Sequence, residues 1–136
     1  MHGGALRLRT PGYGEIVDLT EGIERIVSAS EVGHGVVTVF AVGSTVAVTT
    51  MEYESGGVAD LRALLARLIP ADGDYEHNRR NRDTNAHAHL RAALIGPSES
   101  IPVIDGRLAL GTWQQIVLLD FDDRARDRTI VVEVLS

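Results

Sequence analysis

The sequence contains neither cysteine nor lysine, and each absence excludes a class of chemistry. Without cysteine the protein has no disulfide, no thiolate nucleophile, no iron-sulfur cluster and no cysteine-type zinc site, so only His, Asp or Glu could hold a metal. Without lysine, Schiff-base and P-loop lysine mechanisms are excluded. All 13 basic residues are arginine, whose planar guanidinium can bind phosphate or carboxylate through two hydrogen bonds.

Aromatic residues and net positive charge are also scarce. Aromatic side chains make up 4% of the chain, and 19 acidic residues against 13 basic ones give a formal charge of -6. Nucleic-acid binding needs positive potential and base stacking, so the composition disfavours it. No apolar run approaches the roughly 20 residues that cross a bilayer, and the N-terminus lacks the apolar core of a secretory signal. We expect a cytoplasmic protein with no nucleic-acid or membrane partner.

The chain has enough aliphatic residues to form one hydrophobic core. Hydrophobic residues form 44% of its 136 residues, and a chain of this length usually folds as one domain. We therefore predict a single domain over residues 1–136. The turn Asp105-Gly106 is the strongest short hairpin signal in the chain. Strands are predicted at residues 5–10, 15–19, 101–104, 107–110, 115–121 and 129–135. Residues 36–40 and 46–50 form either one long strand with a glycine kink or two strands with a tight link.

Helices are expected in three places. Thr20 is a plausible N-cap for a short helix over residues 21–30. Residues 58–69 carry an apolar stripe at helical spacing and end at Pro70. A third helix begins at Thr84 or Asn85 and is predicted to bury Ala86, Leu90, Ala93 and Leu94. Hairpins mixed with separated helices predict an α+β fold, with a mostly antiparallel sheet, two to three helices and a C-terminal β-meander.

The polar stretch between the last two helices contains the most informative residues. Residues 71–83 are predicted to form a surface loop of about thirteen residues, and ordered loops of that length are often functional. His77 lies in this loop, and His87 and His89 follow in the first turns of the next helix. Such a cluster indicates a metal site, an acid/base site or merely a polar surface. The H-x9-H-x-H spacing matches no well-known zinc signature, so these alternatives stay open.

Other side chains could complete a site. Arg79 and Arg80 in the same loop could recognise an anion. Glu52 follows an apolar strand and could act as an acid or base, although an exposed strand-end carboxylate is an equally good interpretation. The only tryptophan, Trp113, follows Gly111 and Thr112 and precedes Gln114, and a lone tryptophan is usually a core or interface anchor.

These motifs resemble one known family. They are Tyr75-Glu76-His77, Asn85-Ala86-His87-Ala88-His89-Leu90, Ile101-Pro102-Val103, Gly111-Thr112-Trp113-Gln114-Gln115 and Phe121-Asp122 with the arginine-rich turn behind it. In this order they are similar to the YjbQ-like family of small proteins, some of which are described as having secondary thiamine phosphate synthase activity. The resemblance spans about residues 35–135. It implies a YjbQ-like α+β fold, a homotrimer with its site near a subunit boundary, and a pocket lined by His77, His89 and the Gly111–Gln114 turn.

One departure from the family bears on the chemistry. Where many members have a histidine, this chain has Gly43. Either His87 or, less plausibly, His34 completes the metal shell, or this subgroup no longer performs the family's chemistry. We therefore predict a metal-assisted enzyme acting on a phosphorylated small metabolite, with zinc or magnesium as the divalent metal. Its expected metal ligands are His77, His87 and His89, its catalytic residues are Glu52 and Gln114, and its ligand-binding residues are Arg79, Arg80, Thr112 and Trp113. The alternative is a non-catalytic oligomeric protein that binds a metal ion or a small anion.

Overall fold

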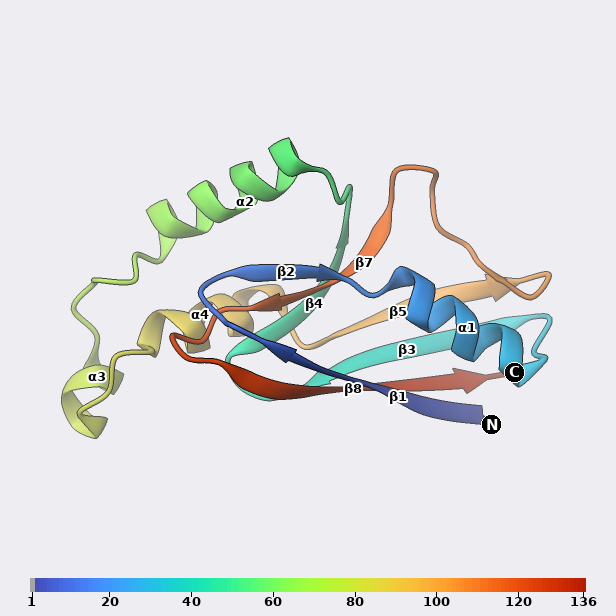
Figure 1. The fold of residues 1–136 in the computed structure, drawn as a ribbon, viewed down its shortest axis with the longest axis horizontal. Coiled ribbons are helices and arrows are strands. Elements are labelled where there is room, and N and C mark those ends of the chain that lie inside the picture. The colour runs from blue at the N-terminus through green and yellow to red at the C-terminus, as the bar shows by residue number, and fades with distance from the viewer. Residues whose placement is uncertain (1) are drawn as a thin grey trace.

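The computed structural model describes residues 2–136 and contains eight strands and four helices within them. In chain order these are β1 (His2–Thr10), β2 (Glu15–Asp18), α1 (Thr20–Ser30), β3 (Gly35–Val42), β4 (Val46–Met51), α2 (Ser55–Leu68), α3 (Glu76–Asn81), α4 (Ala86–Ile95), β5 (Ser98–Ile104), β6 (Arg107–Leu108), β7 (Gln115–Asp120) and β8 (Arg126–Leu135). The molecule is elongated, with α3 at one end and both termini toward the other (Figure 1).

Two antiparallel sheets form the framework. The five-stranded sheet has the order β1-β8-β3-β5-β6, and the three-stranded sheet has the order β2-β7-β4. Strands β7 and β8 are internal strands with a neighbour on each side; Ile130 of β8, for example, pairs with Leu6 of β1 and with Ala41 of β3. Between His2 and Ser136, the chain changes sheets six times, and two of these crossings run from β3 to β4 and from β7 to β8. Both crossings lie at the end of the molecule that carries α4 (Figure 1).

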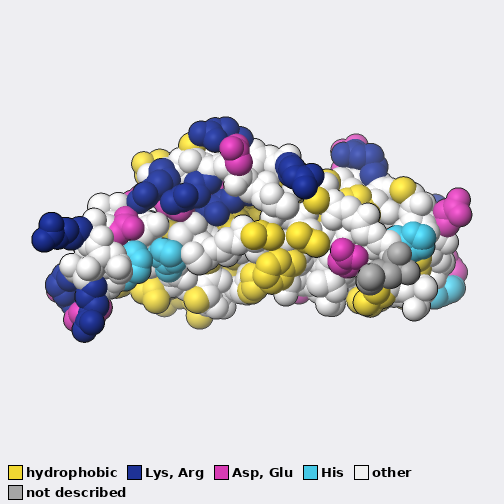
Figure 2. Space-filling model, turned by 90° about the horizontal axis from the view of Figure 1, so that it is seen from below, with side chains coloured by type: hydrophobic (Ala, Val, Ile, Leu, Met, Phe, Trp, Pro, Cys, Tyr) yellow, Lys and Arg dark blue, Asp and Glu magenta, His cyan; other side chains and the backbone are white. Residues whose placement is uncertain are grey.

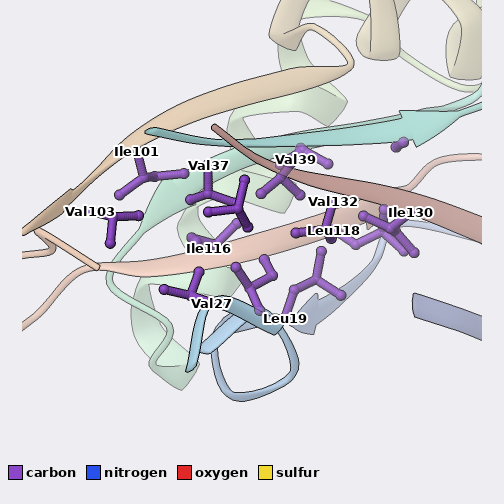
Figure 3. Packing of buried hydrophobic residues seen from close by; sticks show 14 of the residues in the cluster. Leu19, Val27, Val37, Val39, Ile101, Val103, Ile116, Leu118, Ile130 and Val132 are labelled. Carbon is purple, nitrogen blue, oxygen red and sulfur yellow. The ribbon is translucent and has the colours of Figure 1, made fainter. Parts of the chain in front are cut away.

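The main core lies between the two sheets, with α1 beside them. Strand alternation turns Val37 and Val39 of β3 toward Ile116 and Leu118 of β7, and all four are completely buried (Figure 3). Helix α1 adds Ile23 and Val27 at helical spacing. A second, smaller cluster covers the other face of the three-stranded sheet, where α2 and α4 contribute Leu65, Ala88 and Ala92. The layers are therefore, in order, the five-stranded sheet, the three-stranded sheet, and the helices α2 and α4.

The outer face of the five-stranded sheet has no covering layer in the single chain. Phe40 and Val42 of β3, Ile104 of β5 and Leu135 of β8 are each between 42% and 51% exposed. Figure 2 shows hydrophobic side chains gathered in the middle of the molecule's lower surface, with histidines at both ends. A monomer rarely leaves such residues uncovered together, because each loses hydrophobic stabilisation in water.

The structure confirms the α+β class and the antiparallel pairing, and it answers the question left open for residues 36–50. Strands β3 and β4 are two separate strands in different sheets. The Asp105-Gly106 hairpin is also confirmed, because both residues have the left-handed φ values (51° and 76°) that its two-residue turn needs. No helix within residues 2–136 is long and apolar enough to cross a membrane.

Several details of the prediction were wrong. Thr20 is the first residue of α1 and not its cap; its hydroxyl instead accepts a hydrogen bond from the Ile116 N–H. The C-terminal strands do not continue as a meander, because β6, β7 and β8 pair with different neighbours in two sheets. Residues 76–81 form α3, a short polar helix without an apolar face that could have signalled it.

The predicted buried face of α4 was correct at Ala86 and wrong at Leu90, Ala93 and Leu94. Leu90 and Leu94 are 47% and 62% exposed, whereas Ala88 and Ala92 pack on the three-stranded sheet. The small alanines allow the helix backbone to approach the sheet closely, and the larger leucines are left pointing outward. Hydrophobic spacing alone cannot distinguish these two faces when both are apolar.

Replacing Leu118 tests the packing between the sheets. Leu118→Ala removes a fully buried side chain and leaves a cavity, so we expect the free energy of unfolding to fall by about 2 to 5 kcal/mol. Urea denaturation followed by circular dichroism measures it. Leu68→Ala is the matched control, since Leu68 is 61% exposed and its loss should cost less than about 1 kcal/mol. Equal losses for both variants would contradict the assigned core.

Candidate functional site

The imidazoles of His77 and His89 form a pair at the end of the molecule where α3 meets α4. Their ring centroids are 4.7 Å apart and the rings are inclined by 46°. The Asn78 carboxamide connects the two helices, because its Oδ1 accepts hydrogen bonds from the Ala86 N–H (3.0 Å) and from His77 Nδ1 (3.2 Å). Since the Asn78 oxygen is an acceptor, His77 Nδ1 carries the proton. In the neutral ring Nε2 is then the basic nitrogen.

His89 also lines a cavity of about 260 Å³. Its other walls come from the β3–β4 connection, from α4 and from the segment after it, namely Gly43, Ser44, Val46, Ala92, Ala93 and Pro97. These residues are small, and His89 is the only ionisable group among them. This volume lies just below the roughly 300 to 1,000 Å³ typical of ligand pockets, so the cavity has room for a small metabolite or part of one.

His87 does not join the pair. It is 7% exposed, and its Nδ1 has no hydrogen-bond partner in the described structure; the nearby Asn85 Oδ1 is likewise unpaired. Burial lowers the pKa of His87, and the positive charge of Arg91 lowers it further, whereas Asp123 and Asp122 act in the opposite direction. The His87 ring is therefore a neutral, enclosed side chain near physiological pH.

A metal site is not complete in one chain. No group of three His, Asp or Glu side chains within residues 2–136 is arranged to hold one metal ion. The pair of His77 and His89 offers two imidazoles, whereas a catalytic zinc usually has three protein ligands. The residues of a single chain therefore do not fit the predicted metal by themselves, and a third ligand would have to come from another molecule.

The predicted arginine surface is largely neutralised by its neighbours. Arg79 forms ion pairs with Asp74 and Glu76, and Arg80 forms one with Glu76 at 3.4 Å. The hydrogen bond from Arg79 to Glu76 is the main reason that the pKa of Arg79 is raised. These exposed ion pairs lie within α3 and between α3 and the segment before it. They neutralise part of the positive charge that the sequence suggested would be available to a ligand.

Glu52 and the Gly111–Gln114 turn lie together at another part of the molecule. The turn is closed by Gln114, whose Oε1 accepts from the Gly111 N–H and whose Nε2 donates to Thr50 Oγ1, both at 3.0 Å. Trp113 is 73% exposed and packs into no core. Glu52 is exposed, whereas the neighbouring Glu54 caps α2 by accepting hydrogen bonds from the Gly56 and Gly57 N–H groups, which lower its pKa.

Strand β4 separates the two groups of candidate residues. Its first residue, Val46, lines the His89 cavity, and its last, Met51, pairs with Gln115 beside the turn. Five steps along a strand span roughly 17 Å. Within one chain, His77 therefore lies beside His89, and Glu52 lies near Gln114. These two pairs of residues are too far apart to form one site.

A buried charge network, which the sequence interpretation missed, lies behind the cavity. Its members are Thr10, Thr45, Asp120, Asp122, Arg126 and Arg128. Arg128 donates from Nε to Asp120 Oδ2 (2.7 Å) and from Nη2 to Asp120 Oδ1 (2.8 Å) and Thr45 Oγ1 (2.7 Å). Residues 122–127 were predicted only to form a charged turn between two strands. An apolar strand ending in alternating Asp and Arg was the available signal, because such residues can be buried in pairs.

Asp122 is held as a carboxylate within this network. Burial would raise its pKa, but hydrogen bonds from Arg126 (2.6 Å), Thr45 (2.9 Å) and Asn85 outweigh burial and leave the pKa below its ordinary value of 3.8. The same carboxylate thus ties the β3–β4 connection to the start of α4. The walls of the cavity are positioned by a charged group that does not line it.

The comparisons with known proteins agree with this architecture. A family model described as UPF0047 protein YjbQ-like matches residues 4–136. A UPF0047 protein of Archaeoglobus fulgidus is 40% identical over 96% of this chain and 98% of the relative. Another, from Methanothermobacter thermautotrophicus, is 39% identical over 95% of this chain and 88% of its own length.

Solved structures show the same fold. A YbjQ-like protein of unknown function from Sulfolobus solfataricus superimposes with a TM-score of 0.90 at 32% identity, covering 98% of this chain and 97% of the other. A hypothetical protein from Aeropyrum pernix gives 0.92 at 34% identity, covering 100% and 99%. The fold and the paired histidines define a small two-sheet α+β protein with a histidine-lined cavity. The chain belongs to the YjbQ-like UPF0047 family.

Replacing Asp122 tests the network. The lowered pKa means that the unfolded state binds a proton more readily, so this stability is present above about pH 4 and is lost as the pH falls further. We expect Asp122→Asn to lower the free energy of unfolding at pH 7 by about 1 to 3 kcal/mol and to weaken the pH dependence below pH 4. Denaturation between pH 2 and 7 measures both effects.

Asp127→Asn serves as the control for Asp122→Asn. Asp127 pairs with Arg9 at the surface and its side chain is 83% exposed, so its loss should cost less than about 1 kcal/mol. If the two variants have the same stability and the same pH dependence, Asp122 does not have the role assigned to it.

Proposed function

We propose that this protein is a small enzyme acting on a phosphorylated small metabolite, with a reaction like the secondary thiamine phosphate synthase activity ascribed to some family members. The observation that carries the proposal is the His77–His89 pair, because one of its imidazoles lines a cavity and the other has its tautomer fixed by Asn78. An imidazole beside a ligand cavity can serve as a general acid or base.

The proposed reaction joins a pyrimidine diphosphate to a thiazole phosphate, and the departing diphosphate carries growing negative charge. That charge must be neutralised by a divalent metal or by guanidinium groups. Arg79 and Arg80 are already paired with acids, so they contribute less than a free arginine would. Zinc or magnesium remains part of the proposal, on the condition that a second subunit supplies the ligands that one chain lacks.

We propose that the second subunit belongs to a homotrimer. His77 and His89 lie at one end of the three-stranded sheet and Glu52 and Gln114 at the other. In a closed ring of head-to-tail subunits, opposite ends of neighbouring chains meet, so each interface could bring one chain's histidines to the next chain's Glu52, Thr112, Trp113 and Gln114. The exposed Trp113 and the uncovered face of the five-stranded sheet support an association of copies.

A non-catalytic role is the second candidate. An oligomeric protein that binds a metal ion or a small anion would need the histidine pair and the cavity but no general base beside them. The separation of Glu52 from the cavity within one chain favours this alternative, because a carboxylate must lie within hydrogen-bond reach of the proton it removes.

Metal content tests the cofactor part of the proposal. We expect purified wild-type protein to carry about one divalent metal per chain, and His77→Ala and His89→Ala to lose most of it, because each removes an imidazole ligand. Inductively coupled plasma mass spectrometry gives the ratio. His34→Ala is the control, since His34 is exposed and pairs with Asp105 at 3.3 Å on the β5–β6 turn. A metal-free wild-type protein would remove metal from the proposal.

Mixed trimers test whether two chains build the site. His89→Ala and Gln114→Ala proteins should each lose condensation of a pyrimidine diphosphate with a thiazole phosphate. If equal amounts are unfolded together and refolded, random ring assembly gives about a quarter of the interfaces both native halves, and activity should recover to about a quarter of wild type. No recovery would show that neighbouring subunits do not share the site. Wild-type protein that binds metal but turns over no substrate pair would favour the non-catalytic role.

A further inference from the structure

Arg128 has hydrogen-bond capacity that the fold does not use. Its side chain is only 6% exposed, so its donors are expected to have partners. The N–H of Nε and both N–H groups of Nη2 are bonded to Asp120 and Thr45. Nη1, with two further N–H groups, has no bond to any side chain or backbone group of residues 2–136. The guanidinium is thus held rigidly with one edge free.

The free edge lies against Gly43. A Cβ atom built on Gly43 would stand 2.8 Å from Arg128 Nη1 and 3.0 Å from Val46 Cγ1. Gly43 and Val46 line the His89 cavity, whereas Arg128 lines a different cavity together with Arg7 and Arg9. The guanidinium edge can therefore reach the His89 cavity only past Gly43. The φ of 147° at Gly43 is a second reason for glycine, because residues with a side chain rarely adopt it.

The electrostatic surroundings permit an anion at this edge. Asp120 and Asp122 are matched by Arg128 and Arg126 in the buried charge network, so its carboxylates are compensated. Both oxygens of Asp120 accept hydrogen bonds from Arg128, and Oδ2 also accepts from Thr10. The Asp120 carboxylate therefore fixes the guanidinium and leaves the Nη1 hydrogens for a ligand.

We propose that Arg128 Nη1 binds a phosphate oxygen of the ligand in the His89 cavity, and that Gly43 is the specificity-determining residue that gives the ligand access to it. This inference rests on the proposed function and adds the subsite for the phosphate group. His89 contacts the same group from α4, so an imidazole and a guanidinium edge hold it from two sides. A side chain at position 43 would fill the space between them.

Gly43→Ala is the direct test, because the added methyl group would stand 2.8 Å from Nη1 and obstruct it, while the Arg128 and Asp120 side chains themselves are kept. Calorimetric titration with inorganic phosphate should show at least 10-fold weaker binding to Gly43→Ala and to His89→Ala than to wild type. Gly106→Ala is the matched control. Gly106 also has a positive φ (76°), but a Cβ there meets no atom within 4 Å, so phosphate affinity should stay within about 2-fold of wild type.

A second measurement does not depend on a variant that folds. In the wild-type protein, the ¹⁵N resonances of the Arg128 guanidinium should shift on addition of phosphate, whereas those of Arg25, which pairs with Glu21 on the surface of α1, should not. Unchanged Arg128 resonances at saturating phosphate would overturn the assignment.

The outcomes separate this inference from the proposed function. If His89→Ala weakens phosphate binding and Gly43→Ala does not, the Arg128 subsite is wrong and the proposed function stands. If the wild-type protein binds no phosphate, the subsite is also wrong, and the mixed-trimer assay decides the function independently. If both variants weaken binding and Gly106→Ala does not, the subsite is supported.

Discussion

Arg128 and Asp120 connect the two sheets through a pair of parallel hydrogen bonds. Arg128 belongs to β8 in the five-stranded sheet, and Asp120 ends β7 in the three-stranded sheet; both are buried. Transfer of two charges out of water is costly, so such a pair adds little net stability compared with apolar residues. Losing one partner, however, leaves the other charge uncompensated. Among the ways in which two aliphatic sheets could stack, the native one satisfies both charges.

The same network fixes the backbone around the cavity. Thr45 holds the β3–β4 connection, Thr10 accepts a hydrogen bond from the Gly12 N–H in the β1–β2 turn, and Asn85 at the start of α4 donates to Asp122. Segments from both sheets and from a helix are therefore joined to one set of charges. A binding site needs walls that keep their positions without the ligand, and side chains behind the walls provide this.

The sequence predicted those features that depend on local chemistry. Asp105-Gly106 specified its hairpin because few residues adopt two successive left-handed conformations, and the leucine stripe specified α2. Pairing between distant strands left no local signal, so the separation of β7 and β8 into two sheets was not predicted. Hydrophobic spacing was also insufficient for α4, where contact with the sheet selected alanines over leucines.

The sequence predicted only part of the candidate site, because only some of its features depend on local chemistry. His77 and His89 were expected to lie close together because only a short segment separates them in the sequence. The structure confirms this expectation. The position of Glu52 relative to them depended on the direction of β4, which local patterns do not reveal. The role of Arg128 was not predicted, because burial of its guanidinium depends on Asp120 in another sheet.

The pairing of β1 with β8 brings the two ends of the chain together, since His2 lies opposite Val134. Within residues 2–136, β8 is also the only strand that pairs with β1, and β7 is the only one that pairs with β2 and β4. During synthesis, therefore, the edges of β1, β2 and β4 stay unpaired until residues 115–135, which include β7 and β8, have left the ribosome. Cooperative folding of the two sheets can begin only once β7 and β8 are available, and until then the unpaired strand edges are exposed to aggregation and proteolysis.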